Sequence, residues 1–130
     1  MSTIDVATIQ SQADETPPVF KDADGSRKIV QGAWVWVHFD GTGTVAIQES
    51  FNVTSVTDNY TGDYTVNYTT ALPSTTYAAL ISTGDSTGQR QTARMTGSNS
   101  ASSIRINVHY VIDGALQDAP YIGMAAFCNP

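Results

Sequence analysis

The chain has 130 residues, of which 41% are hydrophobic and 14% charged, and its 12 acidic and 6 basic side chains give a net charge of −6. This length suits one domain with an attached arm, and the shortage of clustered Lys and Arg argues against nucleic-acid binding. The apolar runs are far shorter than the roughly 20 residues of a membrane helix, and the first residues lack the basic and apolar regions of a secretion signal. Cys128 is the only cysteine, which excludes an internal disulfide, and we expect it to be a buried, inert thiol on the last strand.

Residues 1–31 differ from the rest and are predicted to form an extended N-terminal arm. The spacing of the first apolar side chains fits a strand, whereas Ser2 with Asp5 three residues later could begin a helix. Pro17 and Pro18 end either structure. The polar run KDADGSRK that follows cannot bury enough apolar area to fold alone. The apolar side chains of the arm, which we expect to bind a partner protein, are Ile4, Val6, Ile9, Val19 and Phe20.

Residues 32–130 are predicted to form an antiparallel β-sandwich. From Ala33 onward apolar and polar residues alternate, and turn residues recur about every 8–12 positions, which is typical of a sandwich or barrel. We expect about eight strands in a jelly-roll-like, all-β fold without a helix. In chain order the expected strands are 33–39, 44–50, 51–57, 64–69, 76–82, 90–96, 104–110 and 121–128. We expect Val45 and Ile47 to point inward. In the other strands the apolar residues are expected to share one side of their strand, as Phe51 does with Val53; the remaining ones are Val35, Val37, Phe39, Tyr64, Val66, Tyr68, Tyr77, Ala79, Ile81, Ile104, Ile106 and Val108.

The first of these strands is apolar on both faces. Val35 and Val37 share one face, while Trp34 and Trp36 share the other. Either the strand is buried on both sides, or the tryptophan face meets another subunit, since large aromatic side chains are enriched at interfaces. Both alternatives are open at this point. The subunit interface that we predict consists of Trp34, Trp36, His38 and His109.

The sequence predicts no catalytic residue, no metal site and no cofactor. His38 and His109 could form a metal pair or supply a general base if their strands adjoined, but hydrogen-bonded surface or interface histidines are the more ordinary interpretation. There is no G-x-S-x-G elbow. Glu49 is the only glutamate of the β region, which leaves no glutamate pair for glycoside hydrolysis. Residues 22–26 begin like a calcium loop, yet the loop positions for its glycine and bidentate glutamate hold Arg27 and Ala33.

A family resemblance is carried by residues 33–80, AWVWVHFDGTGTVAIQESFNVTSVTDNYTGDYTVNYTTALPSTTYAAL. This stretch resembles a domain of tailed-phage and prophage structural proteins, with matches at 41–47, 52–59 and 62–69. The opening STIDVATIQ is also similar to the start of such proteins. The resemblance implies a virion β-sandwich, commonly trimeric and without enzymatic activity. Trp36 and His38 depart from the family, which often has smaller or polar residues there.

Three roles are consistent with these observations. The first is a capsid decoration (cement) or head-fibre protein, a homotrimer made in the host cytoplasm and carried on the outer capsid surface, whose arms bind the major capsid protein. The second is a tail-fibre or receptor-binding module that contacts a host-surface glycan or protein. The third is an enzyme, which the missing motifs disfavour. A chain that starts with Met1 and contains no fibrous shaft or coiled coil favours the first role.

Overall fold

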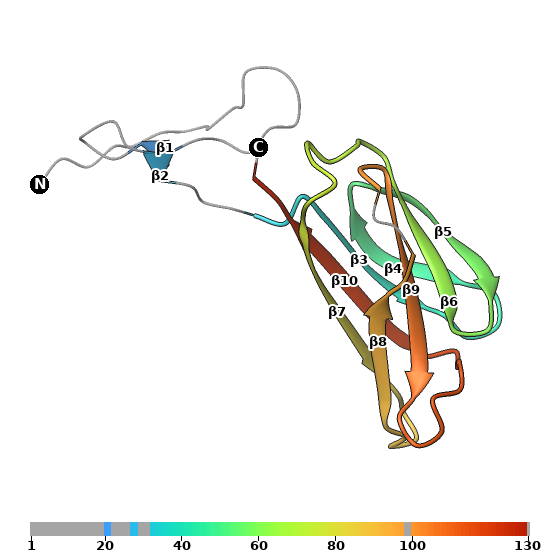
Figure 1. Ribbon diagram of the computed structural model, residues 1–130. Helices are drawn as coiled ribbons and strands as arrows, with labels where there is room; N and C mark the ends of the chain where they lie inside the picture. The colour runs from blue at the N-terminus through green and yellow to red at the C-terminus, as the bar shows by residue number, and fades with distance from the viewer. Residues whose placement is uncertain (1–19, 22–26, 29–31, 98–99, 130) are drawn as a thin grey trace, which may run out of the picture. The chain divides into compact units, whose positions relative to one another are not determined.

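The computed structural model describes residues 20–21, 27–28, 32–97 and 100–129 (Figure 1). The chain divides into two units, residues 1–32 with 130, and residues 33–129. In the first unit β1 (Phe20–Lys21) pairs with β2 (Arg27–Lys28) as an antiparallel ribbon. The predicted arm residues Ile4, Val6, Ile9 and Val19, like the acidic residues 22–26, lie outside the described residues, and only the main chain of Phe20 is described.

The second unit is an antiparallel β-sandwich of eight strands, which confirms the predicted fold class. Its two four-stranded sheets have the orders β4-β3-β10-β7 and β5-β6-β9-β8, and Figure 1 shows them stacked. The sequence predicts a jelly-roll-like fold but not which strands are neighbours. In the structure β3–β4, β5–β6 and β8–β9 are hairpins within a sheet, and the other connections cross between sheets. The strands are β3 (Val35–Asp40), β4 (Ala46–Phe51), β5 (Val53–Tyr60), β6 (Asp63–Tyr68), β7 (Ala78–Gly84), β8 (Gln91–Met95), β9 (Ser103–Tyr110) and β10 (Tyr121–Phe127).

The core forms between the two sheets, where the alternate apolar residues of each strand face the opposite sheet. Burying these branched and aromatic side chains removes apolar surface from water, which is the main favourable term in folding. Cys128 is also buried, as predicted, directly after β10. The described residues contain no helix that is long and apolar enough to cross a membrane. The fully or nearly fully buried core residues are Val35, Val37, Phe39, Tyr64, Val66, Tyr68, Leu72, Tyr77, Ile104, Ile106, Val108, Ala119, Ile122, Met124 and Ala126.

The predicted strand 51–57 is wrong at its start, because the chain changes sheet at Asn52. This residue has a left-handed φ of 58°, a conformation that Asn tolerates better than most residues. Its side-chain amide donates to Trp34 O at 3.1 Å and to Thr70 O at 3.0 Å, and its Oδ1 accepts from Thr70 N at 2.7 Å. Phe51 therefore ends β4 in one sheet, while β5 begins at residue 53 in the other.

A second departure from strict alternation lies in β4. The pairing of β3 with β4 shifts register between His38 and Phe39, so that Glu49 lies opposite His38 while Ile47 lies opposite Phe39. An extra residue of this kind moves the side chains beyond it to the other face. Phe51, predicted to share one side of a strand with Val53, therefore lies on the outer face beside Trp36. Ile47 shares the inner face with Phe39 as predicted, yet it is 39% exposed because β4 is an edge strand.

The buried Tyr64 connects the two sheets at one end of the sandwich. Its hydroxyl lies 2.7 Å from Asp118 Oδ1 and 3.0 Å from the carbonyl oxygen of Gly41. Asp118 also accepts a hydrogen bond of 2.7 Å from the main-chain nitrogen of Gly62. Burial, together with the neighbouring Asp118 carboxylate, raises the pKa of Tyr64 above its usual value. A neutral hydroxyl thus joins β6 to the loops that follow β3 and β9.

Candidate interaction surface

The outer face of the β4-β3-β10-β7 sheet carries a line of apolar side chains that crosses all four strands. Phe51 pairs with Trp36, Trp36 with Ala125, and Ala125 with Leu80. We call these four residues the apolar row. Phe51 is 54%, Trp36 37% and Leu80 63% exposed. Paired residues on neighbouring strands point to the same side of a sheet, so the four side chains lie next to one another on the protein surface.

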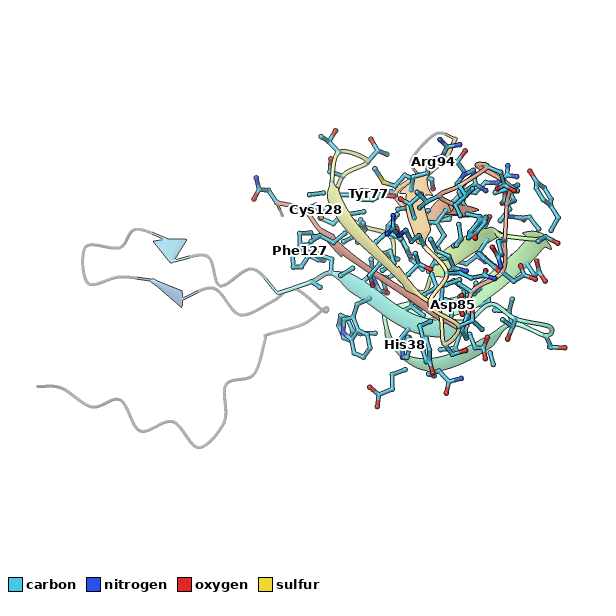
Figure 2. The ribbon with its side chains drawn as sticks, turned by 90° about the horizontal axis from the view of Figure 1, so that it is seen from below. His38, Tyr77, Asp85, Arg94, Phe127 and Cys128 are labelled. Atoms are coloured by element: carbon cyan, nitrogen blue, oxygen red, sulfur yellow. The ribbon has the colours of Figure 1, made fainter. Side chains whose placement is uncertain are left out.

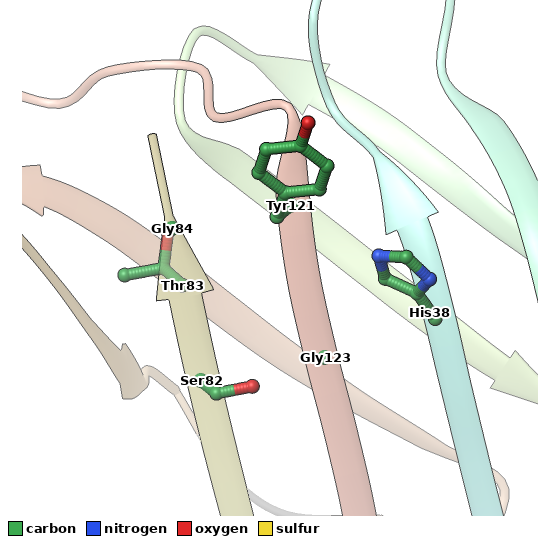
Figure 3. Close-up of a pocket in the computed structure, with 6 residues that line it drawn as sticks. All are labelled: His38, Ser82, Thr83, Gly84, Tyr121 and Gly123. Carbon is green, nitrogen blue, oxygen red and sulfur yellow. The ribbon is translucent and has the colours of Figure 1, made fainter. Parts of the chain in front are cut away.

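A shallow hollow lies beside the apolar row on the same face (Figure 3). Its floor includes Gly123, and an added Cβ atom there would lie only 2.7 Å from Ser82 Oγ, so that a side chain would displace that hydroxyl. The rings of His38 and Tyr121 are nearly parallel, with centroids 6.4 Å apart and an interplanar angle of 18°. The hollow has a volume of about 470 Å³ and is lined by His38, Ser82, Thr83, Gly84, Tyr121 and Gly123.

The outer face of the second sheet has a different character, because an ion pair lies on its central strands. The Asp63 carboxylate accepts hydrogen bonds from Arg105 Nε at 2.7 Å, from Asn107 Nδ2 at 2.6 Å and from Asn59 Nδ2 at 2.8 Å. Burial opposes ionisation of Asp63, but these hydrogen bonds outweigh it and lower the pKa of Asp63 from 3.8 to about 2. Asp63 is buried, whereas the Arg105 side chain is partly open to solvent. This face is polar and charged at its centre.

The four residues of the predicted subunit interface do not lie on one surface. Trp36 and His38 are exposed neighbours on the outer face of β3. Trp34 is half-buried, packs against the core and donates from Nε1 to Cys128 O at 2.8 Å. Of the two alternatives for the tryptophan face, intramolecular packing therefore holds for Trp34, while Trp36 is open to contact. His109 lies on β9 in the other sheet, where its Nδ1 is 3.0 Å from Gly114 O.

The histidines are therefore not a pair. Their strands, β3 and β9, belong to different sheets. Figure 2 shows His38 on the opposite side of the sandwich from Arg94, which lies on β8, the strand paired with the His109 strand β9. Within the described part of the chain, no three His, Cys, Asp or Glu side chains lie close enough together to hold a metal ion. Burial raises the pKa of Cys128, which disfavours the reactive thiolate.

The sequence interpretation found Trp36 but missed Leu80 and Tyr121 as surface residues, and it placed Phe51 in one strand with Val53. Leu80 could have been predicted, because it alternates with Ala79 and Ile81, which share the other side of the expected strand. Phe51 was not readable, because the extra residue in β4 leaves no mark in the alternation. The apolar row is thus a product of strand pairing.

Comparison with protein-family models, with curated proteins and with solved structures gives no match for this chain. The resemblance of residues 33–80 to phage structural proteins therefore stays a prediction from the sequence.

Proposed function

We propose that this chain is a non-enzymatic structural protein of a tailed-phage virion, a homotrimeric capsid decoration or head-fibre protein that binds the capsid shell. The observation that carries the proposal is the exposed apolar row on an otherwise well-packed sandwich. Contiguous apolar surface of this kind usually marks a contact with another protein, because leaving it in water is unfavourable. The family resemblance of residues 33–80 indicates which assembly supplies that contact.

In this proposal the N-terminal arm holds the protein on the shell. Its apolar side chains Ile4, Val6, Ile9, Val19 and Phe20 bind the major capsid protein, for example as a strand added to an exposed sheet edge. The 19 residues before β1 can reach roughly 60 Å when extended, and in this proposal they run across neighbouring capsid subunits. Three arms bound at the same time raise the overall affinity by orders of magnitude without any stronger single contact.

Immunogold labelling of intact particles tests the location directly. We expect label over the shell. Label confined to the tail would contradict the decoration role and support the alternative, a tail-fibre or receptor-binding module. The specific observation that favours this alternative is the hollow, where the ring of Tyr121 and the hydroxyl of Ser82 are chemically suited to a glycan.

The role of the arm is tested with the full-length chain and particles that lack the protein. Changing Ile4, Val6 and Ile9 together to Ser should abolish binding to these particles while the sandwich stays folded, as judged by circular dichroism. The matched control changes the polar residues Thr3, Asp5 and Thr8 of the same segment to Ala and should bind as the wild type does. Binding of the Ile4, Val6 and Ile9 variant at the wild-type level would exclude the arm as the capsid contact.

A further inference from the structure

We propose that the hollow on the outer face of the β4-β3-β10-β7 sheet is a binding site for a neutral carbohydrate, with one sugar ring packed on the ring of Tyr121. The inference goes beyond the proposed function, in which the arm holds the shell and this face of the sandwich is left free. It depends on three features of the hollow: its shape, its hydrogen-bonding groups and the charges around it.

The shape of the hollow follows from the pairing of three strands. Gly123 on β10 lies between His38 on β3 and Ser82 on β7, and because it has no side chain it leaves a gap in the middle of the face. Tyr121, the preceding outward residue of β10, lies at one end of this gap and is 53% exposed. Gly84 pairs with Tyr121 and adds no side chain beside its ring. The volume of about 470 Å³ is in the usual range for a small-ligand site.

The groups that line the hollow suit a sugar. A pyranose has C–H groups on the faces of its ring and hydroxyls around the edge, so it can pack one face on an aromatic ring and keep its hydroxyls free for hydrogen bonds. Figure 3 shows the Ser82 hydroxyl turned toward β10. Within the described part of the chain, the hydroxyls of Ser82 and Tyr121 and the ring nitrogens of His38 make no hydrogen bond to the protein. These groups are therefore available to orient a ligand that packs on the ring.

The charges around the hollow favour a neutral ligand. The arginines of the second unit, all on or next to β8 or β9 in the other sheet, are Arg90, Arg94 and Arg105. At the hollow, in contrast, Glu49 pairs with His38, and Asp85 directly follows Gly84. A phosphate or an acidic sugar would find no arginine here and would be repelled by these carboxylates. A neutral hydroxyl, however, can donate a hydrogen bond to a carboxylate.

The test titrates the isotope-labelled, full-length protein with sugars and follows its backbone amide signals by NMR. The neutral probes are maltotetraose, cellotetraose, mannotetraose, chitotetraose and lactose, and the anionic probes are sialyllactose and tetragalacturonate. A ligand of this size on a shallow site is expected to bind with a Kd on the order of 1 mM, so the titration extends to about 20 mM. At least one neutral sugar should shift the amide signals of Gly123, Ser82 and Gly84, and the anionic sugars should not.

Two variants change the hollow in independent ways. Tyr121→Ala removes the ring and should weaken binding about tenfold, as the loss of one stacking contact does for a nucleobase. Gly123→Ala should also weaken binding, because the added Cβ would lie 2.7 Å from Ser82 Oγ, so that it raises the floor and displaces this hydroxyl. The matched control, Tyr60→Ala, removes a tyrosine of almost equal exposure, 55%, from β5 in the other sheet and should leave the Kd unchanged. Circular dichroism confirms that each variant is folded.

The inference would be overturned if none of the neutral sugars shifted any signal, or if the shifts lay only outside the hollow. Folded Tyr121→Ala and Gly123→Ala proteins that both keep the wild-type Kd would contradict it as well, as would tighter binding of the anionic sugars. The immunogold result is separate. Shell label without sugar binding leaves the virion role and refutes the sugar site, whereas sugar binding that both variants weaken, without label on any particle, leaves the site and refutes the virion role.

Discussion

Replacement of Asp63 by Asn should destabilise the sandwich strongly, because this carboxylate accepts hydrogen bonds from side chains of both neighbouring strands, β5 and β9. It accepts from Arg105, Asn107 and Asn59 at distances of 2.6 to 2.9 Å. The amide group that replaces the carboxylate keeps one acceptor oxygen. Its NH2 group is a donor, and it faces the donors of Asn59, Asn107 and Arg105 without being able to pair with them. Removing one partner of a buried ion pair costs about 3–5 kcal/mol. Arg105 is partly exposed and regains water, so we expect a loss below this range, about 2–3 kcal/mol.

The stabilising effect of Asp63 should also depend on pH, with a defined sign. The pKa of Asp63 is lowered from 3.8 to about 2 in the folded protein, because its hydrogen bonds outweigh burial. A carboxyl group with a lowered folded pKa contributes stability that is present above its unfolded pKa and lost as the pH falls through the folded pKa. The difference of nearly two pH units corresponds to about 2 kcal/mol. The difference in stability between the wild type and Asp63→Asn should therefore be constant above pH 5 and shrink between pH 4 and pH 2.

Urea denaturation of both proteins at a series of pH values measures this difference. For a sandwich of this size, 2 kcal/mol also corresponds to a lower melting temperature by about 10 °C. Asp58→Asn is the matched control, since it removes an exposed carboxylate from the neighbouring strand β5 and should change stability by less than about 0.5 kcal/mol. A stability difference for Asp63→Asn that stays the same from pH 6 to pH 2 would refute the reasoning.

Three other predictions concern the packing of the sandwich. Tyr64→Phe should lower the unfolding free energy by about 1–2 kcal/mol in urea titration, because it removes the hydroxyl that contacts Asp118; an unchanged value would mean that water replaces the hydroxyl. Asn52→Ala should be more destabilising than Asn52→Gly, since both lose the same hydrogen bonds but only Gly adopts a φ of 58° without strain; the reverse order would show that the turn does not need this conformation. Cys128 should react slowly with a thiol reagent at neutral pH and rapidly in urea, because burial shields the thiol and raises its pKa; equal rates would show that the last strand opens readily.

Local patterns in the sequence determined the β-class, the number of strands in the sandwich and most of the core. Val35, Val37 and Phe39 are buried together because successive side chains of a strand point to opposite faces. The same rule correctly placed Tyr64, Val66 and Tyr68, and the long strand with Ile104, Ile106 and Val108. These predictions hold because a period of two depends only on the strand itself and on which face meets the core.

Only the tertiary structure decided which strands adjoin and which side chains share a surface. The extra residue of β4 turns Phe51 outward next to Trp36, and strand pairing then adds Leu80 from a strand 29 residues further along the chain. Likewise, Asp63 and Arg105 are 42 residues apart in sequence and meet because β6 pairs with β9. Such neighbours are set by long-range hydrogen-bond register and by the crossing of the chain between sheets, and neither is encoded in the alternation of a single strand.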